Sequence, residues 1–171
     1  MRRTVIFIDN GVTGSIGIID SDGNSRFMET PIKRMQDYTK AKNIVSRIDT
    51  SAFGMILDPY SLDPDHVIAY IERPMINPQR WKASMSAIRA HESEQSLLDY
   101  LMIPYMFVDS KQWQRRLLPS SGKKGVESST LKKESYDIGL RLFPQHAETI
   151  AKHGDADGIL GAYAFYNDSN R

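Results

Sequence analysis

The sequence predicts an α/β fold, on the basis of two apolar runs and one long helical pattern. Residues 5–8 (VIFI) are β-branched or aromatic, which is typical of a strand buried on both faces. Residues 66–74 (HVIAYIERP) contain a second apolar run that ends in an acid. Residues 81–102 carry apolar side chains at helical spacing. With 171 residues, the chain has the length of one domain with a sizeable core, and we expect a single domain over residues 1–171.

The composition excludes several kinds of site. The chain contains no cysteine, so disulfides, thiolate metal sites and cysteine nucleophiles are excluded, and carboxylates and histidines are the strong metal ligands that remain. Because 22 Lys and Arg oppose 21 Asp and Glu, any affinity for nucleic acid must come from local clusters of charge. No apolar signal region begins the chain, and no run approaches the roughly 20 residues of a membrane span. We therefore expect a soluble, cytoplasmic protein.

The first predicted strand brings a carboxylate to the rim of the core. Asp9 ends the run at residues 5–8, and the turn residues NGVTG lead into a second strand at residues 16–19. A carboxylate beside apolar neighbours is costly unless a cation or a hydrogen-bond donor meets it. Asp9 can alternatively cap the turn through its own backbone, so this stretch alone leaves two interpretations.

The segment after the first hairpin is expected to contain one more strand and little other regular structure. Residues 26–32 can supply a third strand, antiparallel to the second. Residues 33–54 are polar and weakly patterned, which predicts a short helix or a linker. Two Asp-Pro pairs, at residues 58–59 and 63–64, indicate a loop that contains helix-start signals.

Glu72 repeats the pattern of Asp9, because it also ends an apolar strand. Functional groups in an α/β sheet lie at the ends of its strands, so two such acids indicate carboxylates that meet at one edge of the sheet. Taken alone, a Glu at the end of a strand more often forms a surface salt bridge, here with Arg73 or a lysine.

The second half of the chain predicts helices around one further strand. The apolar stripe of the helix at residues 81–102 drifts around the helix axis. This drift indicates that a second face is also covered, for example by a partner subunit. Residues 105–108 form a short strand, and residues 109–113 begin another helix. A helix at residues 131–143 ends before a proline, and an apolar helix with small residues begins near residue 156.

Residues 113–133 form a basic segment that contains a single acid. Its Pro, Ser and Gly residues indicate a mobile loop, and such a loop can lie on phosphates. Surface cations are usually only solvated, so this interpretation depends on another sign of a polyanion. The cations are Arg115, Arg116, Lys123, Lys124, Lys132 and Lys133.

Two acids, Asp155 and Asp157, precede the last predicted helix, and His153 lies just before them. Either acid can be a simple N-cap, but with Asp9 and Glu72 they complete a set of carboxylates. Converging carboxylates without cysteine favour a hard cation such as Mg²⁺ or Mn²⁺. Two such ions about 4 Å apart are a common device for in-line phosphodiester hydrolysis.

The motifs resemble, in order, those of the RuvC-type Holliday junction resolvases of the RNase H-like superfamily, and within them the phage branch. The resemblance lies in IDNGVTGSIGII, AYIERP, WKASMSAI, FVDSKQWQRRLLP with TLKKESYDIGLRLFP, and HGDADGILGAYA, and covers about residues 5–164. It implies an RNase H-like fold, with a five-stranded mixed sheet of three antiparallel and then parallel strands, flanked by helices. It also implies a homodimer that binds branched DNA and cuts two strands of a four-way junction, with two Mg²⁺ per site that Mn²⁺ can replace.

Carried over by position, Asp9, Glu72 and Asp157 match the metal-binding acids of the family. The fourth acid of the family lies a few residues before the last one, where this chain has Asp155 and His153. The resemblance thus implies a catalytic set of these five residues, with the four acids as metal ligands. We favour His153 over Asp155 as the fourth group, because Asp155 can be used as a helix cap.

The loop after Glu72 is expected to contact DNA. Bacterial members of the family place an aromatic wedge three residues after this Glu, and Met75 stands there in this chain. The resemblance therefore implies DNA contacts by Arg73 and Met75, in addition to the basic segment.

Two alternative functions are open at this point. A nuclease of the same fold that acts on RNA or on flaps would keep the same acids. The turn that contains Asp9, Gly11 and Thr13 also resembles the first phosphate loop of sugar kinases, actin and heat-shock ATPases. That class normally surrounds its nucleotide with two such domains, and 171 residues supply only one.

Overall fold

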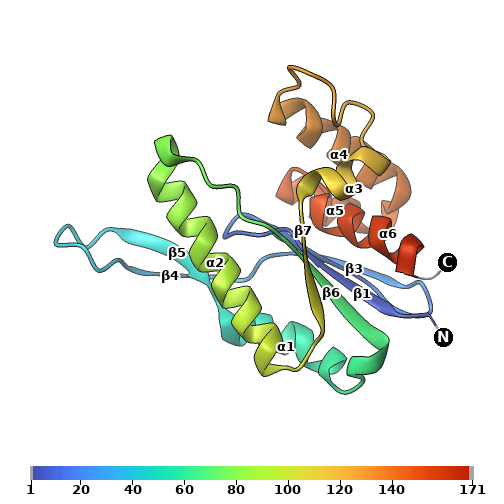
Figure 1. The fold of residues 1–171 in the computed structure, drawn as a ribbon, viewed down its shortest axis with the longest axis horizontal. Coiled ribbons are helices and arrows are strands. Elements are labelled where there is room, and N and C mark those ends of the chain that lie inside the picture. The colour runs from blue at the N-terminus through green and yellow to red at the C-terminus, as the bar shows by residue number, and fades with distance from the viewer. Residues whose placement is uncertain (1, 170–171) are drawn as a thin grey trace.

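A five-stranded mixed sheet forms the centre of the computed structural model, which describes residues 2–169 (Figure 1). The strand order is β3-β2-β1-β6-β7. β1 pairs antiparallel with β2 and β2 with β3, whereas β6 runs parallel to β1 and β7 runs parallel to β6. The predicted order of antiparallel and then parallel strands is therefore confirmed. The strands are β1 (Thr4–Ile8), β2 (Ser15–Ile19), β3 (Ser25–Glu29), β6 (Val67–Glu72) and β7 (Tyr105–Val108).

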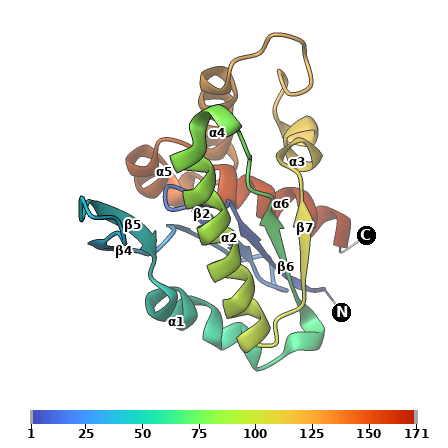
Figure 2. The same cartoon turned by 60° about the vertical axis from the view of Figure 1, so that its left-hand side comes forward.

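Helices cover both faces of this sheet, and the two views in Figures 1 and 2 show the layers. One face carries α1 (Thr50–Ser61) and α2 (Trp81–Tyr100). Four helices lie on the other face: α3 (Ser110–Leu117), α4 (Ser128–Leu142), α5 (Ala147–His153) and α6 (Asp157–Ser169). Within residues 2–169, no helix combines the length and the apolar character that a bilayer crossing requires.

β1 is buried on both faces because all its side chains after Thr4 are apolar, as its sequence predicts. Val5 and Phe7 enter the core beneath α3 to α6, where Phe7 stacks on Phe165 with 6.0 Å between ring centroids. Ile6 and Ile8 enter the core beneath α1 and α2. Since each buried side chain of this size contributes about 1.5–3 kcal/mol, the strand holds the two layers together and fixes the position of the acid that follows it.

Residues 32–48 differ from the prediction of a short helix or a linker. They form β4 (Ile32–Gln36) and β5 (Ile44–Ile48), an antiparallel pair in a sheet of its own. This pair, which we call the β4–β5 arm, projects away from the central sheet (Figure 1). All five side chains of β4 are exposed, so the strand has no buried face to give its sequence a two-residue apolar period. The strand was therefore not predicted, because the alternation of apolar and polar residues that identifies a half-buried strand is absent.

The helix after the arm was also missed. α1 spans Thr50–Ser61 and contains Asp58 and Pro59, which were expected to lie in a loop. Its start is capped by the carboxylate of Asp49, which accepts hydrogen bonds from the backbone N–H groups of Ser51 and Ala52, both at 3.2 Å. Pro59 lies in the last turn, where its ring removes one backbone hydrogen bond and only two helical residues follow.

The other helices follow the prediction with shifted ends. α2 ends at Tyr100, two residues before the predicted end, and Met102 follows with a left-handed backbone (φ 54°). α4 begins at Ser128 instead of residue 131. The short helix α5 was not predicted. α3 begins after Asp109, as expected, and the Asp109 N–H donates to Oε1 of Gln112 at 2.7 Å in a capping box.

Two glycines let α6 approach β2 closely. A Cβ atom at Gly17 would lie 2.2 Å from the carbonyl oxygen of Gly158, and one at Gly158 would lie 2.8 Å from Oγ of Ser15. The N–H of Gly158 donates to the same Ser15 Oγ at 3.1 Å. This contact places the first turn of α6, and Asp157 with it, beside the central sheet.

Gly17→Ala is expected to lower the free energy of unfolding by about 1–3 kcal/mol, the usual cost of forcing a methyl group into a packed contact. The clash is with backbone atoms, which cannot turn away. Urea unfolding followed by circular dichroism measures the effect. Gly54→Ala is the matched control, because its Cβ would meet only Leu97 Cδ1 at 3.5 Å and alanine favours the helix. Equal stability of Gly17→Ala and the wild type would contradict the role of this contact.

Candidate active site

Four acids from three parts of the fold meet at one edge of the central sheet. Asp9 directly follows β1, and Glu72 is the last residue of β6. The two strands are parallel neighbours with Ile8 opposite Ile71, so these acids leave the sheet side by side. Asp157 opens α6, and Asp155 precedes it by two residues. The negative charges of Glu72, Asp157 and Asp155 all act on Asp9, so the acids predicted to form the site lie together.

The carboxylate of Asp9 is not needed to close its turn. The backbone N–H of Asp9 donates to the carbonyl of Ser15 at 2.9 Å, and that of Gly14 donates to the carbonyl of Gly11 at 3.0 Å. Burial raises the pKa of Asp9 well above its usual range, and the negative charge of Glu72 raises it further. A proton or a cation is therefore needed at this position.

Glu72 is held by a side chain that the sequence analysis did not assign to the site. The indole Nε1–H of Trp113 donates to Oε2 of Glu72 at 3.1 Å, and Trp113 is itself fully buried in α3. Burial raises the pKa of Glu72 to about 7, although the Trp113 hydrogen bond acts in the opposite direction. A tryptophan in an amphipathic helix is usually an ordinary core residue, so the sequence around Trp113 gave no sign of its contact with Glu72.

Asp155 is the one acid of the group that stays ionised at low pH. It is only 2% exposed, and it lies between Lys132, with Nζ 2.9 Å from Oδ2, and His153, with Nε2 3.4 Å from Oδ1. Burial alone would raise the pKa of Asp155, but the close contact with His153 and the hydrogen bond from Lys132 outweigh it and lower the pKa to about 2. Lys132, predicted to contact DNA, thus lies against the acid cluster.

Asp157 completes the cluster at the start of α6. Burial raises the pKa of Asp157 to about 6, and the negative charge of Asp155 adds to the effect, while a hydrogen bond with Ser135 opposes it. The backbone N–H of Asp157 donates to Oδ1 of Asp155 at 3.3 Å. Asp155 therefore also caps the helix, which is the alternative that its sequence left open.

The donor set fits a divalent metal ion. One ligand atom from each of Asp9, His153 and Asp155 lies within 4.8 Å of the other two. Glu72 and Asp157 add two further carboxylates to the same cluster, and burial makes their negative charges expensive without a cation. Carboxylate oxygens with one imidazole suit Mg²⁺ or Mn²⁺.

Some of the predicted DNA contacts gather beside Glu72, and others do not. A cleft of about 750 Å³ lies between the loop after β6 and α3, and its lining includes Arg73, Met75, Arg115 and Arg116. The Met75 side chain is 83% exposed. The three remaining lysines are exposed elsewhere, in the connection from α3 to α4 and on α4: Lys123, Lys124 and Lys133.

Two arginines of this cleft also have partners within the protein. Arg73 pairs with Asp109 at 3.4 Å. Arg116 pairs with Asp168, donates to the carbonyl of Ala164 at 3.3 Å and lies over the ring of Phe165 at 5.3 Å. Arg116 therefore also fastens α3 to α6, which its place in a basic run did not indicate.

Comparison with known proteins identifies the fold. Neither a protein-family model nor a curated protein matches the chain. Among solved structures, it is similar to T. thermophilus RuvC in complex with a Holliday junction substrate, with 12% identity and a TM-score of 0.50 over 99% of both chains. A second Thermus thermophilus RuvC structure has 13% identity and a TM-score of 0.42 over 98% of both chains. YeaZ from Pseudomonas aeruginosa has 12% identity and a TM-score of 0.33 over 67% of this chain and 49% of its own.

The first of these likenesses, together with the strand order, shows that this chain has a RuvC-like, RNase H-like fold. This is the fold class that the sequence motifs implied.

Proposed function

We propose that this protein is a metal-dependent, structure-selective endodeoxyribonuclease that resolves four-way junctions and other branched DNA by paired phosphodiester hydrolysis. The observation that carries the proposal is the convergence of Asp9, Glu72, Asp155 and Asp157, in which burial raises the pKa of three of the four carboxylates. Divalent cations relieve such a concentration of buried negative charge. The RuvC-like fold supports the same function, since one similar structure holds a Holliday junction substrate.

The four acids would hold two Mg²⁺ ions, or Mn²⁺ in their place. Two bound ions activate a water molecule and stabilise the leaving oxygen in such a reaction. The chain's own side chains prepare the site for them. Trp113 orients Glu72 through its indole N–H, and Lys132 offsets the charge of Asp155. His153 lies against Asp155 and can serve as a fifth site group.

DNA contacts and subunit contacts complete the proposal. The cleft with Arg73, Met75, Arg115 and Arg116 is positioned to receive DNA next to Glu72, and the exposed lysines between α3 and α4 can reach phosphates further away. A two-fold homodimer, built in part on α2, would supply two sites for two strands of like polarity. In favour of this dimer, Trp81 and Tyr100 of α2 are 65% and 82% exposed.

We also propose that residues 1–171 form one nuclease domain that acts in the cytoplasm of a bacterial or phage-infected cell. For its lineage we propose the phage branch of the RuvC-type enzymes, and Met75 at the position of the bacterial aromatic wedge is compatible with it.

A comparison of four substrates tests the proposal. The purified protein with Mg²⁺ is incubated with a four-way junction, a flap, a linear duplex and an RNA–DNA hybrid, each labelled on one strand at a time. We expect nicks in two junction strands of like polarity and an intact duplex, with no cleavage by Asp9→Asn. Preferred cutting of the hybrid or the flap would instead favour the alternative nuclease. ATP hydrolysis without any cleavage would favour a phosphate-binding ATPase domain.

A further inference from the structure

The β4–β5 arm carries a concentration of positive charge that the proposed active site does not use. Residues 32–48 contain one acid, and the hydroxyl of Thr39 at the arm's turn donates to that acid, Asp37, at 2.7 Å. Solvated surface cations are common, so the charge alone assigns no role. The arm's cations are Lys33, Arg34, Lys40, Lys42 and Arg47.

Arg47, at the base of the arm, differs from an ordinary surface cation. Its Nε and Nη2 atoms are buried and have no hydrogen-bond partner within residues 2–169. The guanidinium lies 4.8 Å from the ring centroid of Tyr38, a contact that leaves its N–H groups unused. A buried charged group without a partner costs several kcal/mol, and buried polar groups nearly always have one. The buried N–H groups of Arg47 are therefore open to an acceptor from outside the described chain, such as a water molecule or an anion.

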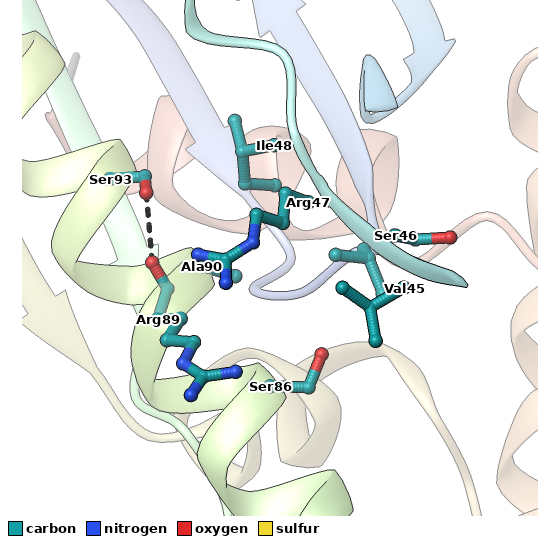
Figure 3. Close-up of a pocket in the computed structure, with 9 residues that line it drawn as sticks. Val45, Ser46, Arg47, Ile48, Ser86, Arg89, Ala90 and Ser93 are labelled. Atoms are coloured by element: carbon teal, nitrogen blue, oxygen red, sulfur yellow. Dashed lines mark hydrogen bonds between the residues drawn. The ribbon is translucent and has the colours of Figure 1, made fainter. Parts of the chain in front are cut away.

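A second arginine points into the same space. Figure 3 shows the guanidinium groups of Arg47 on β5 and Arg89 on α2 entering one pocket, with the hydroxyl of Ser86 facing it. None of the described residues that line this pocket is acidic. Two guanidinium forks beside a hydroxyl provide directed donors for a phosphate group.

The size of the pocket indicates how such a group would bind. Its volume is about 30 Å³, more than the roughly 10–15 Å³ that one water-sized group needs but too little for a whole phosphate. One phosphate oxygen therefore fits inside, while the rest of the group stays at the mouth. Arg89 is exposed and lies at this mouth, so it can meet the outer oxygens.

The pocket adjoins the turn that carries Asp9. Val12, which lies in that turn, is one of the residues that line the pocket. The backbone N–H of Gly11 in the same turn donates to Oε1 of Glu94 at 3.4 Å, and Glu94 follows the pocket residue Ser93 on α2. The pocket therefore lies beside the turn that follows Asp9.

We propose that the Arg47–Arg89 pocket binds one backbone phosphate of the DNA substrate and that the β4–β5 arm follows the same strand away from the active site. The proposal rests on the proposed function for the class of ligand, which is DNA. Charge complementarity supports it, because the arm and the pocket are basic and the pocket has no acid of its own.

Junction binding at several salt concentrations tests this proposal. The measurements use Asp9→Asn protein without divalent ions, so that no cleavage occurs. Adding Arg47→Gln and Arg89→Gln should reduce the slope of log affinity against log salt by about 0.9, the value for one lost phosphate contact on duplex DNA. Adding Arg2→Gln instead is the control. Arg2 is exposed just before the first residue of β1, at the opposite end of the strand from Asp9, so this change should leave the slope unchanged.

Arg89→Gln alone keeps the test decisive if the Arg47 change unfolds the protein, because Arg89 is exposed. This single variant should also weaken junction binding more than Arg2→Gln does. An unchanged slope in both arginine variants would overturn the proposal. In that case, stabilisation of the wild type alone by inorganic phosphate would indicate a free-anion site, and loss of dimer mass in sedimentation would indicate a contact between subunits.

The outcome is separate from that of the proposed function. A reduced slope, with no metal-dependent cleavage of any substrate by the wild type, would support the phosphate site and reject the nuclease. Normal junction cleavage with an unchanged slope would do the reverse.

Discussion

Glu72→Gln is expected to abolish the proposed Mg²⁺-dependent cleavage of a four-way junction and to leave junction binding intact. The change removes one negative charge from the acid cluster and keeps the shape of the side chain, and the amide oxygen can still accept the hydrogen bond from Trp113. Metal ions supply several kcal/mol of transition-state stabilisation in such sites, and each 1.4 kcal/mol is a factor of ten. We expect the single-turnover rate to fall at least about a thousandfold. Binding should persist because it depends on phosphate contacts.

Asp109→Asn is the matched control for this experiment. Asp109 also acts on Glu72 through its charge, but it is exposed and pairs with Arg73 outside the cluster. Its asparagine variant loses the same charge and can still cap α3, so its rate should stay close to that of the wild type. Robust cleavage by Glu72→Gln, or equal losses in both variants, would remove Glu72 from the catalytic set.

Glu94→Gln is expected to stabilise the protein strongly at alkaline pH and hardly at all at acid pH. Glu94 is fully buried in α2, and its Oε2 atom has no hydrogen-bond partner in the described part of the chain. Burial raises the pKa of Glu94 to about 8, although the hydrogen bond from the Gly11 N–H opposes the shift. The neutral glutamine keeps the shape of the side chain and removes the need to bury a charge.

The sign of the pH dependence follows from the proton balance. The usual pKa of this carboxyl group is 4.5, so the unfolded chain releases the proton near that pH, while the folded protein keeps it up to about pH 8. The folded state therefore binds more protons in this window, and stability falls as the pH rises through it. At pH 8.5, Glu94→Gln should exceed the wild type by on the order of 4 kcal/mol, and near pH 5 by about 1 kcal/mol or less.

Urea unfolding at the two pH values measures this difference. Comparing each variant with the wild type at the same pH cancels the titration of the other buried acids. Glu92→Gln is the control, because Glu92 is exposed on the same helix. Its stability relative to the wild type should not change with pH. A constant difference between Glu94→Gln and the wild type at both pH values would mean that Glu94 is not held as a neutral acid.

The buried framework of the fold could be predicted from the sequence, whereas the arm could not. β1 and β6 are apolar runs that end in an acid, so both their burial and the position of Asp9 and Glu72 follow from local pattern. All five side chains of β4 are exposed, so the strand carries no periodic signal. Its sequence therefore does not distinguish a strand from a linker.

The side chains that support the candidate site come from segments that are distant in the sequence, and local sequence does not show that these segments meet. Trp113 meets Glu72 across 41 residues, and Lys132 meets Asp155 across 23. Trp113 resembles an ordinary core residue, and Lys132 resembles one more cation in a basic run. Glu94 has the sequence of a polar helix surface, and only the packing of α2 against the turn after β1 reveals that it is buried.

The close packing of α6 on β2 also determines when the acid cluster can exist during synthesis. Asp9 and Glu72 leave the ribosome early, but Asp157 belongs to the last helix of the described chain and reaches them only when Gly17 and Gly158 are in contact. Contacts between such distant segments form late in folding. A nascent or partly folded chain therefore lacks the complete set of acids. For the proposed nuclease, cleavage would therefore begin only after α6 has packed on β2.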